Sequence, residues 1–116
     1  MIKLKRVYEK PERTDGKRLL VDRLWPRGLR KEDARINEWL KEFAPSDSLR
    51  QWYGHKEEQW QEFRQRYRAE LKKPEASELL LKLRQEGKRQ TVTLLFGAKD
   101  EERNNAVVLK DFLEKG

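Results

Sequence analysis

Residues 18–29 read Arg-Leu-Leu-Val-Asp-Arg-Leu-Trp-Pro-Arg-Gly-Leu, and they carry more structural information than any other part of the chain. The apolar run 19–21 has the length and branching of a strand that is buried on both faces. Asp22 and Arg23 follow at once, and then comes a Trp-Pro-Arg-Gly corner, where proline fixes its own φ and glycine permits unusual backbone angles. Ligands of open α/β sheets bind where strands end at their carboxyl side, so these charged residues mark a candidate site.

The composition predicts one folded domain. Hydrophobic residues make up 35% of the 116 residues and charged residues 42%. Leu, Ile, Val and Phe number 27 of 116, which lies above the roughly 20% level below which chains tend to stay disordered. Strands that alternate with amphipathic helices then predict a single α/β domain, with a small, mostly parallel sheet flanked by helices.

The positive charge is concentrated near the N-terminus. The net charge is +7, and residues 1–35 hold 12 Lys or Arg against 6 Asp or Glu. Such a balance favours an acidic or phosphate-bearing partner. A nucleic-acid partner is expected less than a small-molecule partner, because no basic helix or arm is evident.

Several classes of site are excluded by residue counts. There is no Cys and a single His, His55, so no disulfide, thiolate nucleophile, zinc-thiolate site or His-cluster metal site is expected. We expect no metal and no cofactor. No apolar stretch approaches the roughly 20 residues of a membrane span, and the N-terminus lacks a signal-peptide pattern, so a cytoplasmic location is the default expectation.

Hydrophobic spacing predicts three strands, and the predicted ranges are 2–8, 18–24 and 91–96. The short link between the first two, with its Asp15-Gly16 turn signal, leaves both a hairpin and a short parallel crossover open.

The same spacing predicts five helices, at 32–43, 46–52, 56–73, 75–86 and 101–115. Trp39-Leu40, inside the first of these, fits a short strand as an alternative. In the fourth, Leu79, Leu80 and Leu83 are expected to face inward and Gly87 to end the helix. Asp100 is the expected N-cap of the last.

Two predicted strand ends carry acids, Asp22 and Asp100, beside basic residues. If the strands are parallel neighbours, both sets open onto one edge. Arg23 and Arg27 present donor forks suited to phosphate or carboxylate, with Lys99 as a further cation, and Gly97 with the amides of the last helix could form an anion cradle. The structural alternative is an ion pair of Asp22 with a neighbouring arginine, with Asp100 acting only as a cap.

Aromatic residues and the histidine supply the other candidates. His55 is the only side chain expected to titrate near neutral pH, and a local loop role is its alternative. Trp25 and Trp52 could stack on a planar ligand, although packing under the loops is the simpler expectation. A Mg²⁺ site built from carboxylates lacks a supporting spacing.

Several blocks of the sequence resemble the YeaO-like family of small bacterial proteins of unknown function. They are Val21-Asp-Arg-Leu-Trp-Pro-Arg-Gly28, Ala44-Pro-Ser46, Trp52-Tyr-Gly-His55, Phe63-Arg-Gln-Arg-Tyr67, Thr93-Leu-Leu-Phe-Gly-Ala-Lys-Asp100 and Asn104-Asn-Ala-Val107. The resemblance covers nearly the whole chain and implies an α/β fold. Longer members of the wider group carry a Cys at the end of the last strand and a Cys-His pair further on. The matching positions here are Phe96, Asn104 and Asn105, so the resemblance implies no thiol chemistry.

The leading hypothesis is an α/β domain that binds a small anionic ligand, phosphate-bearing or nucleotide-like, at the carboxyl ends of its strands. The candidate catalytic residues are Asp22, His55 and Asp100, and the candidate ligand-binding residues are Arg23, Trp25, Arg27, Lys99 and Asn105. An interaction module for nucleic acid or protein that uses the basic first third is the alternative, and a scaffold without activity is a third. Whether the domain is an enzyme, and its oligomeric state, stay open.

Overall fold

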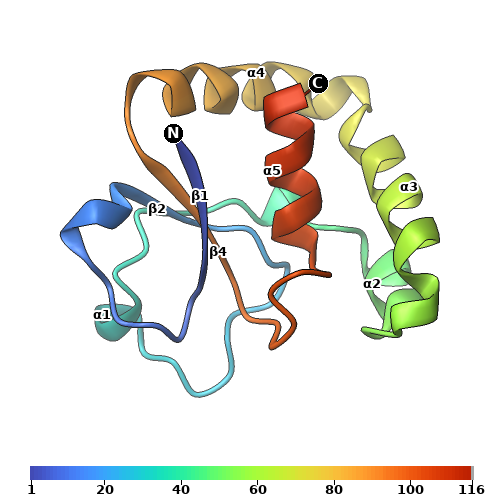
Figure 1. The fold of residues 1–116 in the computed structure, drawn as a ribbon, viewed down its shortest axis with the longest axis horizontal. Coiled ribbons are helices and arrows are strands. Elements are labelled where there is room, and N and C mark those ends of the chain that lie inside the picture. The colour runs from blue at the N-terminus through green and yellow to red at the C-terminus, as the bar shows by residue number, and fades with distance from the viewer. Residues whose placement is uncertain (116) are drawn as a thin grey trace.

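A computed structural model describes residues 1–115, which form a four-stranded parallel sheet with the strand order β1-β4-β2-β3 (Figure 1). The strands are β1 (Ile2–Arg6), β2 (Lys17–Leu20), β3 (Glu38–Trp39) and β4 (Val92–Phe96). The helices are α1 (Lys31–Ala34), α2 (Asp47–Tyr53), α3 (Trp60–Leu71), α4 (Pro74–Arg89) and α5 (Asn105–Lys115). Short 3-10 helices lie at η1 (Arg13–Asp15), η2 (Lys41–Phe43) and η3 (Glu57–Gln59). The predicted single α/β fold is confirmed, and the sheet is entirely parallel.

One face of the sheet builds the main core. Side chains alternate along a strand, so every second residue points to the same face. This face is covered by α2, α3, α4 and α5, and Figure 1 shows α5 alongside β1 and β4. Its strand residues are Ile2, Leu4, Leu19, Val21, Val92, Leu94 and Phe96.

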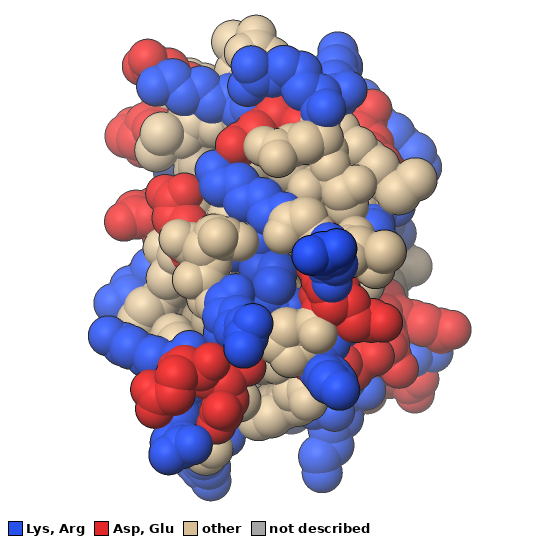
Figure 2. Space-filling model, turned by 90° about the vertical axis from the view of Figure 1, so that its left-hand side faces the viewer, with Lys and Arg blue, Asp and Glu red and all other residues tan. Residues whose placement is uncertain are grey.

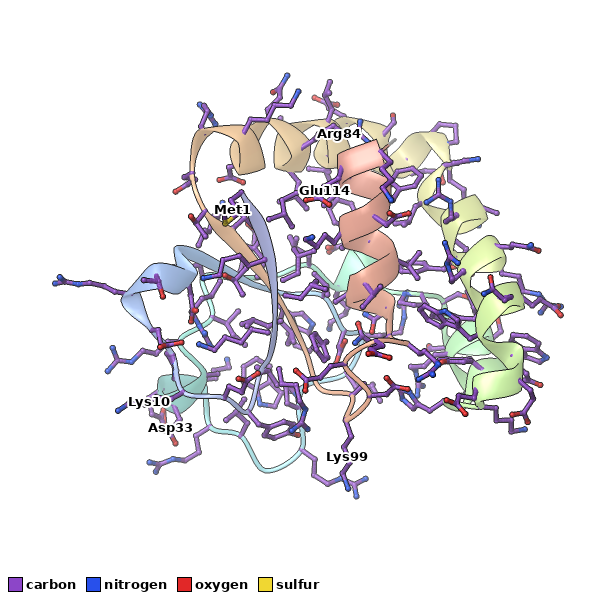
Figure 3. All side chains as sticks on the ribbon, in the orientation of Figure 1. Met1, Lys10, Asp33, Arg84, Lys99 and Glu114 are labelled. Atoms are coloured by element: carbon purple, nitrogen blue, oxygen red, sulfur yellow. The ribbon has the colours of Figure 1, made fainter. Side chains whose placement is uncertain are left out.

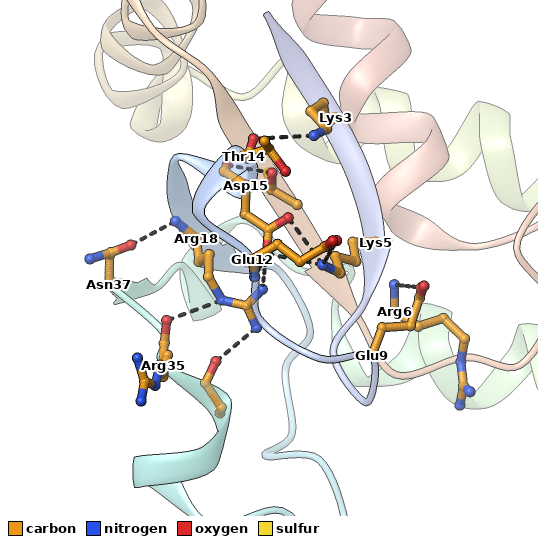
Figure 4. Close-up of polar contacts among 12 residues, drawn as sticks. Lys3, Lys5, Arg6, Glu9, Glu12, Thr14, Asp15, Arg18, Arg35 and Asn37 are labelled. Carbon is orange, nitrogen blue, oxygen red and sulfur yellow. Dashed lines mark hydrogen bonds and ion pairs between the residues drawn. The ribbon is translucent and has the colours of Figure 1, made fainter.

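The opposite face combines a small apolar cluster with buried charges. Leu20 and Leu95 pack there against Trp25 and Trp39. The charges surround Asp15, the last residue of η1, which lies in the connection between β1 and β2 (Figure 4). This face therefore depends on ion pairing as well as on apolar packing.

The Asp15 carboxylate is almost completely buried and accepts from two basic side chains. Arg18 Nη1 lies 2.6 Å from its Oδ2, and Lys5 Nζ lies 3.1 Å from each oxygen. The Arg18 guanidinium also donates to the carbonyls of Ala34 and Arg35 (Figure 4). Burial alone raises the pKa of Asp15, but the hydrogen bonds it accepts, first from a backbone amide, outweigh burial and hold the pKa below its usual value.

The connection between β1 and β2 is a parallel crossover and not a hairpin. β4 lies between the two strands, with Leu94 in register with both Leu4 and Leu19. The predicted last strand is thus the central one, and all five residues of β4 are buried.

The prediction of a helix over 32–43 was wrong, and the strand alternative at Trp39 was right. α1 ends at Ala34, and Arg35 takes a left-handed φ of 49°. Asn37 then exchanges hydrogen bonds with the Arg18 backbone, and β3 pairs with β2. Pairing with the sheet has overridden the helical spacing of the apolar residues.

Helix ends differ from the predictions where tertiary contacts intervene. α4 continues through Gly87, where an added Cβ would lie 2.7 Å from Ile2 Cγ1, so this glycine serves close packing and does not end the helix. Leu79 is 49% exposed, contrary to the prediction, while Leu80 and Leu83 are buried as expected. The helix predicted over 56–73 begins later, as η3 followed by α3.

The N-termini of α2 and α5 are each capped by a side chain. α2 forms as predicted, with the Ser46 hydroxyl accepting from the Leu49 amide and Gly54 in the left-handed region at its end. α5 begins at Asn105 and not at 101, because the Asn104 side chain accepts from the Val107 amide at 3.0 Å. Asn104, and not Asp100, is the N-cap.

Asp15→Asn should lower the free energy of unfolding by about 3–5 kcal/mol, because a neutral amide leaves the buried Arg18 without a carboxylate partner and Lys5 with only the exposed Glu12. The loss should be measured by urea unfolding at pH 7. It should shrink as the pH falls below about 4 toward the lowered pKa of Asp15, where the carboxylate of the folded wild type becomes protonated. Glu114→Gln, which removes a partner of the exposed pair with Lys110, is the matched control and should cost less than about 0.5 kcal/mol. Equal losses in the two variants would contradict the buried network.

Candidate functional site

Three segments meet at the Asp22 carboxylate. Asp22 follows β2, and its Oδ2 accepts from the amide of Gly97, which follows β4, at 2.8 Å. Its Oδ1 accepts from Asn105 Nδ2 at 3.1 Å, and the same nitrogen donates to the Val21 carbonyl at 2.8 Å. The expectation that the ends of these two strands lie side by side is confirmed.

A pocket of about 160 Å³ opens beside this junction. It combines charged and polar groups with apolar and aromatic walls. Its lining residues are Asp22, Arg23, Leu24, Pro45, Arg50, Tyr53, His55, Phe63, Ala98 and Asn105.

Two guanidinium groups line the pocket, and neither forms a tight ion pair. Arg23 donates from Nε to the Pro45 carbonyl at 2.9 Å, and its Nη2 lies 3.4 Å from the Ala44 carbonyl. Asp47 Oδ1 lies 3.7 Å from Arg23 Nε and 3.4 Å from Arg50 Nη2. Among residues 1–115, the Nε of Arg50 is the one buried side-chain nitrogen or oxygen without a hydrogen-bond partner.

Asp22 is surrounded by neutral donors. Burial raises the pKa of its carboxyl group, while the hydrogen bonds from Gly97 and Asn105, and the nearby His55, act in the opposite direction without cancelling the shift. The sequence alternative of an ion pair with Arg23 or Arg27 is wrong, because the carboxylate bonds to these two amides instead.

His55 and Tyr53 form the wall at the end of α2. His55 is exposed, has a left-handed φ of 58°, and its ring centroid lies 5.6 Å from that of Tyr53. Tyr53 stacks on Phe63 at 4.3 Å, and its hydroxyl donates to the Arg103 carbonyl. The aromatic groups therefore pack against one another, and the histidine stands at the solvent side.

Four of the eight predicted site residues line the pocket, namely Asp22, Arg23, His55 and Asn105. Trp25 does not: its indole donates to the Leu29 carbonyl and meets Trp39 edge to face, under the corner loop. Arg27 is exposed and outside the lining, and its carbonyl accepts from the Tyr8 hydroxyl.

Asp100 and Lys99 also lie outside the lining. Asp100 accepts from the amides of Glu102 and Arg103 and pairs with the Arg103 guanidinium, and these contacts hold its pKa below the usual value. Lys99 extends away from the fold (Figure 3). The expected anion cradle at Gly97 is also wrong, because its amide already donates to Asp22.

Sequence reasoning missed Arg50. It lies on α2, three residues before Tyr53 and four after the Ser46 cap, so it shares the helix face that turns toward the pocket. That spacing was readable in the sequence. The approach of α3, which brings Phe63 against Tyr53, carried no local signal.

The basic residues of the first third do not form one continuous patch. Lys5, Lys17 and Arg18 pair with carboxylates, and Arg6 donates to two carbonyls. Figure 2 shows Lys and Arg interspersed with acidic and uncharged residues on the side that carries η1 and α1. Part of the positive charge of residues 1–35 is therefore paired within the fold.

Residues 1–115 contain neither a metal-binding cluster nor a membrane-spanning helix. No group of three or more His, Cys, Asp or Glu side chains is placed to hold a metal ion. Within the same residues, every helix is too short or too polar to cross a bilayer.

Comparisons with known proteins identify the relatives of the chain. The sequence model of the family described as "Inactive DUF488-N3 subclade" matches residues 1–116. The "Uncharacterized protein YeaO" of Escherichia coli is 44% identical, over 97% of this chain and 96% of its own. The "Uncharacterized protein Rv3073c" of Mycobacterium tuberculosis is 42% identical, over 97% of this chain and 92% of its own. No solved structure matches significantly.

The raised pKa of Asp22 gives a pH-dependent signature. Because the folded state holds this proton more tightly than the unfolded chain, ionisation costs stability as the pH rises through and above about 4. The free energy of unfolding of wild type should therefore fall relative to that of Asp22→Asn between about pH 4 and pH 7, measured by urea titration. If the free energy of unfolding of wild type instead rose relative to that of Asp22→Asn over this range, the raised pKa of Asp22 would be contradicted.

Proposed function

Since the chain belongs to the inactive DUF488-N3 subclade, we propose that it is a binding domain for a small anionic ligand. The ligand occupies the pocket at the carboxyl ends of β2 and β4. Arg23 and Arg50 hold its anionic group, and Asp22 and Asn105 orient its polar groups.

The single observation that carries this proposal is the state of Arg50. Buried polar groups in native proteins nearly always have a hydrogen-bond partner, and a buried donor without one costs about 1–3 kcal/mol or more when charged. Its Nε is buried and unpartnered beside a pocket that a second guanidinium also lines. Guanidinium forks match carboxylate and phosphate oxygens. The Arg50 side chain as a whole is 40% exposed, so it can turn toward an anion in the pocket, which would then supply the missing partner.

Three residues favour binding over catalysis. The family resemblance matches Phe96, Asn104 and Asn105 to positions where longer members of the wider group carry Cys and His. Phe96 lies in the core, Asn104 caps α5, and Asn105 bonds to Asp22. These side chains hold the fold together and offer no nucleophile. The description of the family as inactive points in the same direction.

A small ligand is also favoured over a nucleic acid. Nucleic-acid interfaces depend on several cations free to meet phosphates, whereas Lys5, Lys17 and Arg18 are already paired within the fold. The pocket, with about 160 Å³, suits a metabolite.

The test uses inorganic phosphate and a panel of phosphorylated and carboxylated metabolites, with binding measured by thermal shift and calorimetry. Wild type should be stabilised by at least one class, and Arg50→Gln should weaken that binding by at least tenfold, about 1.4 kcal/mol. Arg27→Gln is the matched control, because it removes the same charge from an exposed position outside the pocket, and its binding should equal that of wild type. No stabilisation by any compound, or equal losses in both variants, would refute the proposal.

Asp47→Asn should strengthen anion binding. The Asp47 carboxylate faces both guanidinium groups at 3.4–3.7 Å and is itself largely exposed, so it competes with a ligand at modest strength. An exposed pair of this kind is worth up to about 1 kcal/mol, which predicts about a two- to fivefold gain in affinity by calorimetry. Weaker binding in this variant would mean that Asp47 supports the site.

A further inference from the structure

The pocket holds unlike charges that do not pair with each other. Asp22 accepts hydrogen bonds from neutral amides at the strand ends. Arg23 donates to the Pro45 carbonyl, and the Asp47 carboxylate lies near the guanidinium groups of both Arg23 and Arg50. A ligand that fills this pocket therefore meets a carboxylate at one part of the wall and guanidinium groups at another.

The Asp22 side favours a cationic group. Each carboxylate oxygen accepts one hydrogen bond from the protein and has capacity for another. Burial of a charge is costly unless an opposite charge compensates it. Burial raises the pKa of Asp22 in spite of its two amide hydrogen bonds and the nearby His55. A primary ammonium supplies the charge and donates up to three hydrogen bonds.

The arginine side accommodates a carboxylate. Asp47 Oδ1 already lies between the two guanidinium groups, at 3.7 Å and 3.4 Å. The distances are too long for optimal hydrogen bonds, which lie near 2.7–2.9 Å for such charged pairs. The side chain of Asp47 is 63% exposed, so a ligand carboxylate can take its place and bind more closely.

The remaining walls are apolar and the volume is small. Leu24, Pro45 and Ala98 line the pocket, and Leu24 is 57% exposed. Covering it with an aliphatic group would remove apolar surface from water. Drug-sized ligands need about 300 Å³ or more, whereas this pocket has about 160 Å³.

We propose that the ligand is an aliphatic α-amino acid, bound through its carboxylate to Arg23 and Arg50, through its ammonium to Asp22, and through its side chain to Leu24. This inference rests on the proposed anion-binding function and narrows it to a zwitterion. It requires both charges on one small molecule, a property that simple anions lack.

The experiment compares L-leucine with two analogues that each lack one charge, 4-methylpentanoate and 3-methylbutylamine. Calorimetry and chemical-shift mapping at millimolar concentrations, on the full chain, give the affinities. L-leucine, or a smaller aliphatic amino acid in a series down to L-alanine, should bind at least tenfold more tightly than either single-charge analogue. The largest shifts should fall on the amides of residues 22–24 and 97–98.

Variants separate this inference from the broader proposal. Asp22→Asn should weaken amino-acid binding at least tenfold, to about the affinity of 4-methylpentanoate. The affinity of 4-methylpentanoate for this variant should be no lower than its affinity for wild type. Asp33→Asn, at an exposed carboxylate paired with Arg30, is the matched control and should bind as wild type does. Retained binding of 4-methylpentanoate shows that Asp22→Asn still folds.

Each contrary outcome has a distinct meaning. If 4-methylpentanoate or phosphate binds wild type as tightly as any amino acid, the zwitterion inference fails and anion binding stands. If amino acids bind and Arg50→Gln leaves their affinity unchanged, both the inference and the role of Arg50 fail. If none of the amino acids binds, the inference is refuted, and the metabolite panel decides whether anion binding survives.

Discussion

The carboxylate of Asp22 accepts one hydrogen bond from the Gly97 amide and one from the Asn105 side chain, and so joins the ends of β2 and β4 to the start of α5. This junction forms the polar end of the pocket, and α2 and α3 supply walls on its other sides. A Cβ added at Gly97 would lie 3.2 Å from Asp22 Oδ2, so the carboxylate would have to shift by a few tenths of an ångström to admit a larger residue. The junction therefore fixes the backbone on which the polar end of the pocket depends.

The two faces of the sheet contribute differently to that rigidity. One face is an apolar core closed by four helices, which holds α2 and α3 against the strands. The other face is closed by η1, by α1 and by the loop that carries Trp25 and Leu29, and it buries only a small apolar cluster. There the Asp15–Arg18 pair, with Lys5 beside it, links η1, β1 and β2. A small domain with limited apolar content uses ion pairing where hydrophobic packing is insufficient.

The chemistry of the site follows from which groups the fold leaves without a partner. Asp100 and the Gly97 amide are satisfied within the protein, so they have little capacity to act on a ligand. Arg50 keeps a buried donor free, and Asp22 has only neutral partners. Free charges of opposite sign around a small cavity favour recognition, whereas Phe96 packs in the core and Asn104 caps α5.

The sequence by itself determined the elements whose signals are local. The apolar run at 19–21, the Ser46 cap and the aromatic spacing of α3 each predicted the right structure, because propensity and capping act over a few residues. Strand ends likewise pointed to Asp22 and Arg23. Only the tertiary structure decided that β3 replaces a helix, that Arg27 faces solvent, and that Arg50 and Phe63 reach the pocket. These outcomes depend on pairing between distant segments, such as the bond from the Trp39 indole to the Asp22 carbonyl, which local spacing does not encode.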